Sequence, residues 1–482
     1  KGRTMANNCK IFTPEEYVEE LLDAVEYREH LYGQSVLENS CGDGNILMGV
    51  VRRYILSCRA DGRTDEEIRR GLERDICGME LEEKHAAKCR ENLHAVATQL
   101  GIEEVKWNII EGNYLHYSFN RQFDYVLSNP PYVVYRDIEQ GERDYLKEHF
   151  TCCAEGKFDY YYAFIEKSMT ELTPNGKMAY IIPYSIYKNV FARKLREQIK
   201  PYVAKICDYT SQQKFPGITT SSTILVIQNT PSIRFSYTDE VTGEQIEILK
   251  ERLSSKWIFI RYLEAFEEMY RAKRQPFKFG TYFDVNNTIA TLYNEAFLLE
   301  GYTLNGEYYE SETGDKVEAA LVRPAVSKKK RNQDNLYIIF PYKWENGVLT
   351  HYEDKDFRKK FPYATAHLLQ YETKLGKRAV DKSAKWFEYG RSQAITKITQ
   401  EKLVLPSIIS STVNVTEEDA DTIPCAGFFI TAKGEHTLAE AKKILESAEF
   451  YDYLKLIGIF TTGKSRRLTV KDIANYTFDN WE

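Results

Sequence analysis

Asn129, Pro130, Pro131 and Tyr132 form the stretch of this chain whose side chains are best suited to chemistry. They follow residues 123–127, which have the apolar composition of a strand. The side-chain oxygen of Asn129 and the carbonyl of Pro130 can both accept hydrogen bonds from one amine, and the prolines stiffen the turn because their φ is locked. A planar amine held in this way loses its conjugation with the attached ring, so its lone pair can attack an electrophilic methyl group. The ring of Tyr132 offers a face on which a base could stack, and the pattern therefore predicts amine methylation.

A turn that contains two glycines lies upstream and could hold the methyl donor. Residues 35–38 read as a buried strand, and an apolar-periodic helix follows at residues 46–56. Between them, Gly42 and Gly44 let the backbone pass close to a ligand at a strand-to-helix turn. S-adenosylmethionine, a donor without phosphate groups, would also need an acidic residue at the tip of the next strand to bind its ribose hydroxyls. Glu80 ends such a strand.

The order of these motifs resembles that of the gamma-type adenine-specific DNA methyltransferases, the TaqI-like and type IIG modification enzymes. In that family, an N-terminal cofactor segment, a glycine turn, an acidic strand tip and the Asn-Pro-Pro-Tyr turn precede a C-terminal target-recognition domain. The resemblance implies a set of cofactor-binding residues: Thr13, Glu38, Cys41, Gly42, Glu80 and Asn113.

Thr13 and Asn113 each have a specific place in the family pattern. Thr13 belongs to the segment that folds over the methionine end of the cofactor in the family. Asn113 stands where the family usually has an Asp that binds the adenine amine of the cofactor. The side-chain oxygen of Asn113 can still accept that hydrogen bond, but an uncharged acceptor binds more weakly than a carboxylate.

Aromatic residues around the catalytic turn are candidates for contact with the target base. Phe215 precedes a β-branched segment at residues 222–227, where relatives place an aromatic ring on the flipped base opposite the tyrosine of the turn. The alternative for Phe215 is a purely structural plug. Tyr184, near the end of another expected strand, is a second candidate.

Length and pattern predict two domains. A chain of 482 residues is too long for one ordinary core. Strands alternate with helices up to residue 229, which indicates an open, mainly parallel sheet with helices on both faces. We therefore expect an α/β fold: a Rossmann-like class I methyltransferase domain with a mostly parallel seven-stranded sheet at residues 1–232, and a mixed α/β target-recognition domain at residues 233–482. The charged stretch at residues 60–74 is expected to be a solvated excursion.

Charge is informative about nucleic-acid binding. The formal net charge of −6 argues against a surface that binds polyanions everywhere, but local basic clusters can still contact DNA. Arg and Gln have the donor geometry for base edges, whereas Lys suits phosphates. The candidate DNA-binding residues are Lys329, Lys330, Arg331, Arg391 and Gln393. Each basic cluster can equally be a solvated face.

Together these features predict a site-specific enzyme that transfers a methyl group from S-adenosylmethionine to the 6-amino group of a flipped adenine in double-stranded DNA. We expect it to act in restriction-modification, with a separate restriction endonuclease as a further partner and no nuclease in this chain. The alternatives are methylation of a cytosine amine, of an RNA amine or of a protein glutamine, and a catalytically idle DNA-specificity module. The nine cysteines show no CxxC pair, so no metal site is expected, and a cytoplasmic protein without a membrane segment fits best.

Overall fold

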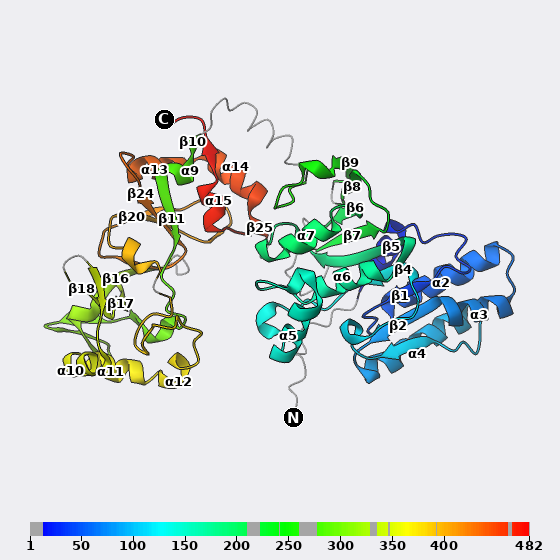
Figure 1. The fold of residues 1–482 in the computed structure, drawn as a ribbon, viewed down its shortest axis with the longest axis horizontal. Helices are drawn as coiled ribbons and strands as arrows, with labels where there is room; N and C mark the ends of the chain where they lie inside the picture. Colours follow the sequence, from blue (N-terminus) through cyan, green and yellow to red (C-terminus); the bar gives the residue numbers. More distant parts are fainter. Residues whose placement is uncertain are drawn as a thin grey trace. The chain divides into compact units, whose positions relative to one another are not determined.

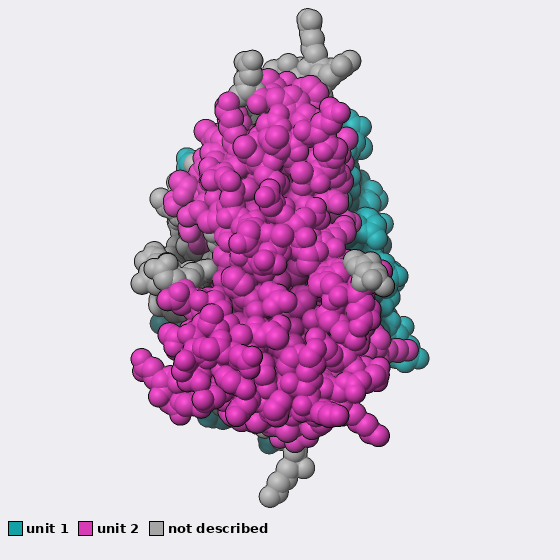
Figure 2. Space-filling view, turned by 90° about the vertical axis from the view of Figure 1, so that its left-hand side faces the viewer, with its two compact units in different colours: residues 1–264, 459–463 teal, residues 265–458, 464–482 magenta. Residues whose placement is uncertain are grey.

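The computed structural model describes residues 13–209, 222–240, 242–259, 277–327, 335–345, 348–391, 393–460 and 465–481. The chain forms two compact units, coloured separately in Figure 2: Lys1–Glu264 with Ile459–Gly463, and Ala265–Gly458 with Lys464–Glu482. The first unit extends past residue 232, where the sequence pattern changes. This is because β8 (Arg234–Asp239) and β9 (Glu244–Leu249) continue its sheet.

A nine-stranded sheet forms the centre of the first unit, in the order β3-β2-β1-β4-β5-β7-β6-β8-β9 (Figure 1). The strands from β3 to β5 run parallel, and β7 is antiparallel to both of its neighbours. The remaining strands of this sheet are β1 Val36–Glu38, β2 Ile76–Glu80, β3 Asn108–Glu111, β4 Phe123–Ser128, β5 Leu172–Pro183, β6 Val203–Asp208 and β7 Ser222–Gln228. The short β25 Ile459–Phe460 does not belong to this sheet. The first seven strands give the mostly parallel arrangement expected from the sequence, and β8 and β9 extend it.

Helices cover both faces of this sheet (Figure 1). The helices are α1 Glu15–Ala24, α2 Asn45–Ala60, α3 Asp65–Asp75, α4 Glu83–Gln99, α5 Gln140–His149, α6 Tyr161–Thr170 and α7 Arg193–Ile199. Side chains alternate along each central strand, so Val36 and Leu127 pack into the core beneath α1 to α4, whereas Leu37 and Val126 pack into the core beneath α5 to α7. Because both faces are buried, the central strands are almost continuously apolar.

The charged stretch at residues 60–74 has a helical composition and contains most of the helix α3, but this helix packs on the first unit through buried residues and is not the solvated excursion that we expected. The Thr64 side chain accepts a hydrogen bond from the backbone of Glu67, and the Glu67 carboxylate accepts one from the backbone of Thr64, which is a capping box at the start of α3. Ile68 and Leu72, four residues apart, are buried against α2 and β2. The many charged residues of α3 conceal this narrow apolar face in the sequence.

The second unit is a mixed α and β structure with its own core. Its larger sheets have the orders β11-β24-β20-β22 and β12-β17-β16-β23. Its strands are β10 Phe277–Lys278, β11 Phe283–Asn287, β12 Leu298–Glu300, β13 Thr303–Asn305, β14 Tyr308–Glu310, β15 Lys316–Glu318, β16 Val322–Ser327, β17 Leu336–Ile339, β18 Tyr342–Glu345, β19 Val348–His351, β20 Lys402–Leu405, β21 Ile408–Ile409, β22 Thr416–Glu418, β23 Ile423–Ala426, β24 Phe428–Ala432, β26 Arg466–Arg467 and β27 Thr477–Phe478. Its helices are α9 Phe279–Tyr282, α10 Asp354–Lys360, α11 Pro362–Leu369, α12 Glu372–Leu375, α13 Leu438–Leu445, α14 Ala448–Ile457 and α15 Val470–Ala474. Within the ranges given above, no helix of either unit is long and apolar enough to cross a membrane.

Candidate active site

The side chain of Asn129 is held from both ends directly after β4. Its Nδ2 donates a hydrogen bond to Oγ1 of Thr13 at 3.2 Å, and its Oδ1 accepts one from the hydroxyl of Tyr132 at 2.8 Å. These contacts fix the plane of the amide, so its oxygen is aimed before any ligand arrives. The N-terminal segment and the catalytic turn, 116 positions apart in the chain, meet at this amide.

A second acceptor lies next to this amide. Pro130 is a buried residue, yet its carbonyl oxygen accepts no hydrogen bond from the described part of the chain. Buried carbonyl groups are nearly always paired, so an open one at the carboxyl end of a central strand is consistent with a ligand site. Asn129 and Pro130 thus place two oxygen acceptors at adjacent positions.

The ring of Tyr132 is half-buried and packs edge-to-face on Tyr161, with ring centroids 5.9 Å apart. Its hydroxyl also lies 2.7 Å from the carbonyl of Ile181. The Asn129 oxygen has two lone pairs, so it can accept a hydrogen bond from Tyr132 and from a further donor together. Burial raises the pKa of Tyr132, which keeps this hydroxyl protonated and able to donate.

The glycine turn after β1 lies directly beside the catalytic turn. Oγ of Ser40 is 3.1 Å from Oγ of Ser128 and donates to the carbonyl of Asn129 at 3.4 Å. Gly42 has φ +52°, and no described atom lies within 4 Å of the position that a Cβ would take there. Gly44 differs, because a Cβ at that position would lie 2.6 Å from Sγ of Cys89. The space beside Gly42 is therefore open, whereas Gly44 is required for packing.

Glu80, at the tip of β2, faces the same turn. Its carboxylate accepts hydrogen bonds from the backbone N–H of Gly42 at 2.9 Å and of Glu82 at 3.0 Å. Leu81 follows it with 54% of its surface exposed. The sequence reasoning missed Leu81, although an apolar residue directly after the acidic strand tip was a visible signal. An exposed apolar side chain beside a half-buried carboxylate suits a ligand with both a ring and hydroxyl groups.

Glu38 and Cys41 lie in the interior. Glu38 is 2% exposed, and its Oε2 accepts the N–H of Leu47 at 3.2 Å in the first turn of α2. Burial, together with the neighbouring Cys89 thiol, raises the pKa of Glu38 well above its ordinary value. Cys41 is buried too, and its backbone N–H donates to the carbonyl of Met79 at 2.9 Å. Both residues therefore shape the glycine turn from inside.

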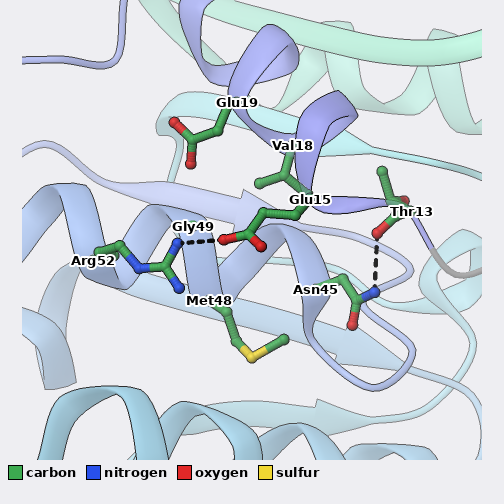
Figure 3. A pocket seen from close by; sticks show the side chains of 8 residues that line it. All are labelled: Thr13, Glu15, Val18, Glu19, Asn45, Met48, Gly49 and Arg52. Carbon is green, nitrogen blue, oxygen red and sulfur yellow. Dashed lines mark hydrogen bonds and ion pairs between the residues drawn. The ribbon is translucent and has the colours of Figure 1, made fainter. Parts of the chain in front are cut away.

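Thr13 is anchored by a second contact from the glycine turn. Its carbonyl accepts a hydrogen bond from Nδ2 of Asn45 at 2.9 Å (Figure 3). A cavity of about 140 Å³ lies beside this contact, between α1 and α2, and is bordered by an ion pair of Arg52 with Glu15 at 2.9 Å. Residues that line it are Thr13, Glu15, Val18, Glu19, Asn45, Met48, Gly49 and Arg52. Thr13 is thus held at the edge of the site.

Asn113 follows β3 and begins the short 3-10 helix Tyr114–His116. Its Oδ1 accepts the backbone N–H of Leu115 at 3.0 Å, and its Nδ2 lies 3.5 Å from Oε1 of Glu142. The sequence reasoning did not identify Glu142, which lies 29 positions further along the chain.

The other predicted site residues lie elsewhere or outside the described residues. Tyr184 is buried and packs against the rings of Tyr187 and Phe259. In the second unit, the exposed Arg391 forms an ion pair with Asp381 at 2.7 Å, and Gln393 is exposed. The predicted residues that the structure does not describe are Phe215, Lys329, Lys330 and Arg331. In the described chain, no three His, Cys, Asp or Glu side chains are grouped so that they could hold a metal ion.

Comparison with known proteins relates the first unit to restriction-modification enzymes. Residues 63–215 match the Eco57I restriction-modification methylase family. The chain is 24% identical over 329 residues to the type II restriction enzyme and methyltransferase RM.Eco57I of Escherichia coli, covering 61% of this chain and 33% of that protein. It is 26% identical over 237 residues to the modification methylase CviBIII of Paramecium bursaria Chlorella virus NC1A, covering 49% of this chain and 54% of that protein. The matched part therefore spans between a third and about half of the length of these relatives.

A solved structure resembles nearly the whole chain. The type IIL restriction-modification enzyme MmeI, solved in complex with DNA, matches with a TM-score of 0.59 and 14% identity, covering 96% of this chain and 64% of that one. At this identity the likeness shows the fold, and it confirms the predicted α/β class I methyltransferase fold with an additional C-terminal sheet domain. The chain thus combines that fold with sequence similarity to restriction-modification methylases.

Proposed function

We propose that this chain is an S-adenosylmethionine-dependent DNA methyltransferase of the gamma, TaqI-like arrangement that methylates the 6-amino group of adenine in double-stranded DNA. The first unit would carry methyl transfer, and the second would recognise the target sequence. The observation that carries the proposal is the aimed side-chain amide of Asn129 beside the open carbonyl of Pro130, in a turn that the glycine turn contacts through the hydrogen bond from Ser40 to the main-chain carbonyl of Asn129. The sequence similarity to restriction-modification methylases supports the same conclusion.

The residues of the first unit fit the cofactor. When bound, S-adenosylmethionine supplies an electrophilic methyl group on its sulfonium. Gly42 leaves open space for a ligand, and Glu80 can exchange its bonds to backbone amides for bonds to the ribose hydroxyls. Leu81 offers an apolar wall for the adenine ring. Thr13 contacts the side-chain amide of Asn129, so it lies beside the catalytic turn, where the resemblance places the methionine end of the cofactor.

The catalytic turn would work mainly by positioning the target amine. The target adenine must leave the duplex, because a stacked base cannot reach the end of β4. Unstacking costs a few kcal/mol, and stacking on Tyr132 offsets about 1–3 kcal/mol of this cost. The amine would donate to the oxygens of Asn129 and Pro130, which would hold its nitrogen towards the methyl group that the cofactor supplies, and the proton lost from the methylated amine would pass to solvent. No side chain has to act as a nucleophile.

The test is to incubate the protein with S-adenosylmethionine and unmethylated DNA and to identify the methylated nucleosides by mass spectrometry. We expect N6-methyldeoxyadenosine from the wild type and none from Asn129→Ala, while both proteins bind S-adenosylhomocysteine in calorimetry. N4-methyldeoxycytidine as the product would reassign the target to cytosine. Methylation of RNA or protein instead of DNA in parallel reactions would refute the DNA assignment. Failure of the wild type to bind the cofactor product would leave only the role of an idle specificity module.

The proposed biological setting is restriction-modification, because the relative RM.Eco57I is named as a restriction enzyme and methyltransferase. We propose that a separate endonuclease cleaves the sequence that this chain protects. DNA from cells that express the chain should resist that endonuclease, and DNA from cells that express Asn129→Ala should not.

A further inference from the structure

A carboxylate on α5 lies beside the side chain that follows β3. The side chain of Glu142 is 15% exposed. Its Oε1 accepts a hydrogen bond from the hydroxyl of Tyr160 at 2.9 Å, and its Oε2 lies 2.8 Å from Nε2 of His116. The same Oε1 lies 3.5 Å from Nδ2 of Asn113. Glu142 is thus held in place from two sides while it faces the Asn113 amide.

The contacts of Asn113 fix which end of its amide points at which neighbour. Nδ2 is directed at the carboxylate of Glu142, so Oδ1 is directed the other way, where it accepts the N–H of Leu115. An amide oxygen has two lone pairs, and one of them remains for a further donor. A negative charge behind the amide nitrogen polarises the amide and makes its oxygen a stronger acceptor, and this effect is larger away from bulk water.

The position of Asn113 relative to Glu80 indicates which donor this oxygen would meet. β3 is the neighbour of β2, with Glu111 paired to Glu80, and the N–H of Gly112 donates to the Glu80 carbonyl at 2.9 Å. A nucleoside held by its ribose at Glu80, with its ring against Leu81, extends along this edge of the sheet. The exocyclic amine of such a nucleoside would be directed toward Asn113, which lies two residues beyond the end of β3.

We propose that Glu142 is a positioning residue that orients and polarises Asn113 to accept the adenine amine of the cofactor. The negative charge of this subsite is thus carried by Glu142 on α5, and it acts on the ligand through the side-chain amide of Asn113. This inference rests on the proposed function, because it needs S-adenosylmethionine in the site. The inference also explains why the uncharged Asn113, two residues beyond the end of β3, can bind the adenine amine without a carboxylate of its own.

The test measures ligand binding by calorimetry and uses two ligands that differ in one group. S-adenosylhomocysteine carries the 6-amino group, and S-inosylhomocysteine carries an oxygen in its place. We expect Glu142→Gln to weaken binding of the adenosine ligand about 5- to 10-fold, because it removes the negative charge that polarises the Asn113 amide, and to leave binding of the inosine ligand unchanged. The matched control is Glu111→Gln, which removes a carboxylate on β3 that pairs with the exposed Arg90 and should change neither affinity.

A second pair of variants relocates the charge. Asn113→Asp alone should weaken binding of S-adenosylhomocysteine, because it sets two carboxylates against each other at a separation of about one hydrogen bond. Asn113→Asp combined with Glu142→Gln leaves a single carboxylate at the subsite and should restore the affinity to within about twofold of the wild type.

The outcomes separate this inference from the proposed function. An equal loss for both ligands in Glu142→Gln would show a purely structural role and overturn the inference, as would unchanged affinities or a double variant no tighter than Asn113→Asp. A wild-type protein that binds neither ligand would refute the proposed function itself.

Discussion

Removing only the hydroxyl of Tyr132 separates its two contributions to the site. In Tyr132→Phe the ring keeps its place against Tyr161, while the hydrogen bonds that reach Asn129 and Ile181 are lost. A hydrogen bond of this kind contributes about 0.5–1.5 kcal/mol, so the rate of methyl transfer should fall about 2- to 13-fold. Tyr132→Ala also loses base stacking, worth about 1–3 kcal/mol, and its rate should fall about 10- to 2,000-fold.

The assay is single-turnover transfer of a labelled methyl group into unmethylated duplex DNA, with binding of S-adenosylhomocysteine measured in parallel. The matched control is Tyr161→Phe, because the buried Tyr161 hydroxyl makes no hydrogen bond to the described residues. The control should transfer methyl groups at the wild-type rate. If Tyr132→Phe were as slow as Tyr132→Ala, or as fast as the control, the role of the Tyr132 hydroxyl in aiming the Asn129 amide would be refuted.

Three further predictions concern the glycine turn, a buried carboxyl group and the second unit. Gly42→Ala should lower the free energy of unfolding by about 1–2 kcal/mol, because the backbone there has a positive φ, and it should strongly weaken S-adenosylhomocysteine binding. Gly44→Ala should lower the free energy of unfolding in urea by more, because the added Cβ would meet the sulfur of Cys89. Equal stabilities of the two variants would contradict the packing argument. Burial raises the pKa of Asp159 from 3.8 to about 6, so its contribution to stability is present below pH 4 and is lost as pH rises through 6. The free energy of unfolding of Asp159→Asn should therefore exceed that of the wild type by about 3 kcal/mol at pH 8, and a difference that persists at pH 4 would count against this cause. Arg391→Ala should weaken DNA binding in fluorescence anisotropy about 5- to 10-fold at a stability cost of at most about 1 kcal/mol. Arg378→Ala should mainly destabilise the fold, because the Arg378 guanidinium donates hydrogen bonds to four backbone carbonyls. Unaltered DNA binding by Arg391→Ala would remove this residue from the interface.

The strands and turns that form the site could be predicted because their signals are local. The apolar run before Asn129, the glycines after β1 and the acidic end of β2 are each visible within a few residues. The parallel order of the strands then brings these strand ends to one edge of the sheet. The contact of Asn129 with Thr13 follows from this arrangement only once the fold is known, since no local pattern specifies which hydroxyl the amide meets.

Other features escaped the sequence analysis for physical reasons. Glu142 lies on a mostly polar helix and acquires its role only because α5 is brought against the residues after β3. The extent of the first unit was missed because β8 buries Phe235 and Tyr237 together with the polar Asp239, a mixture without a clean apolar period. A strand of this composition resembles a loop in the sequence, although its backbone pairs with β6 and β9.

The hydrogen bond between Thr13 and Asn129 makes the orientation of the catalytic amide depend on a residue outside the Asn-Pro-Pro-Tyr turn. Substitutions that displace Thr13 would misdirect the acceptor oxygen of Asn129 and would slow methyl transfer as substitutions in the turn do. A crosslink that holds residue 13 in place should restore the rate in variants that displace Thr13, but not in variants of the turn.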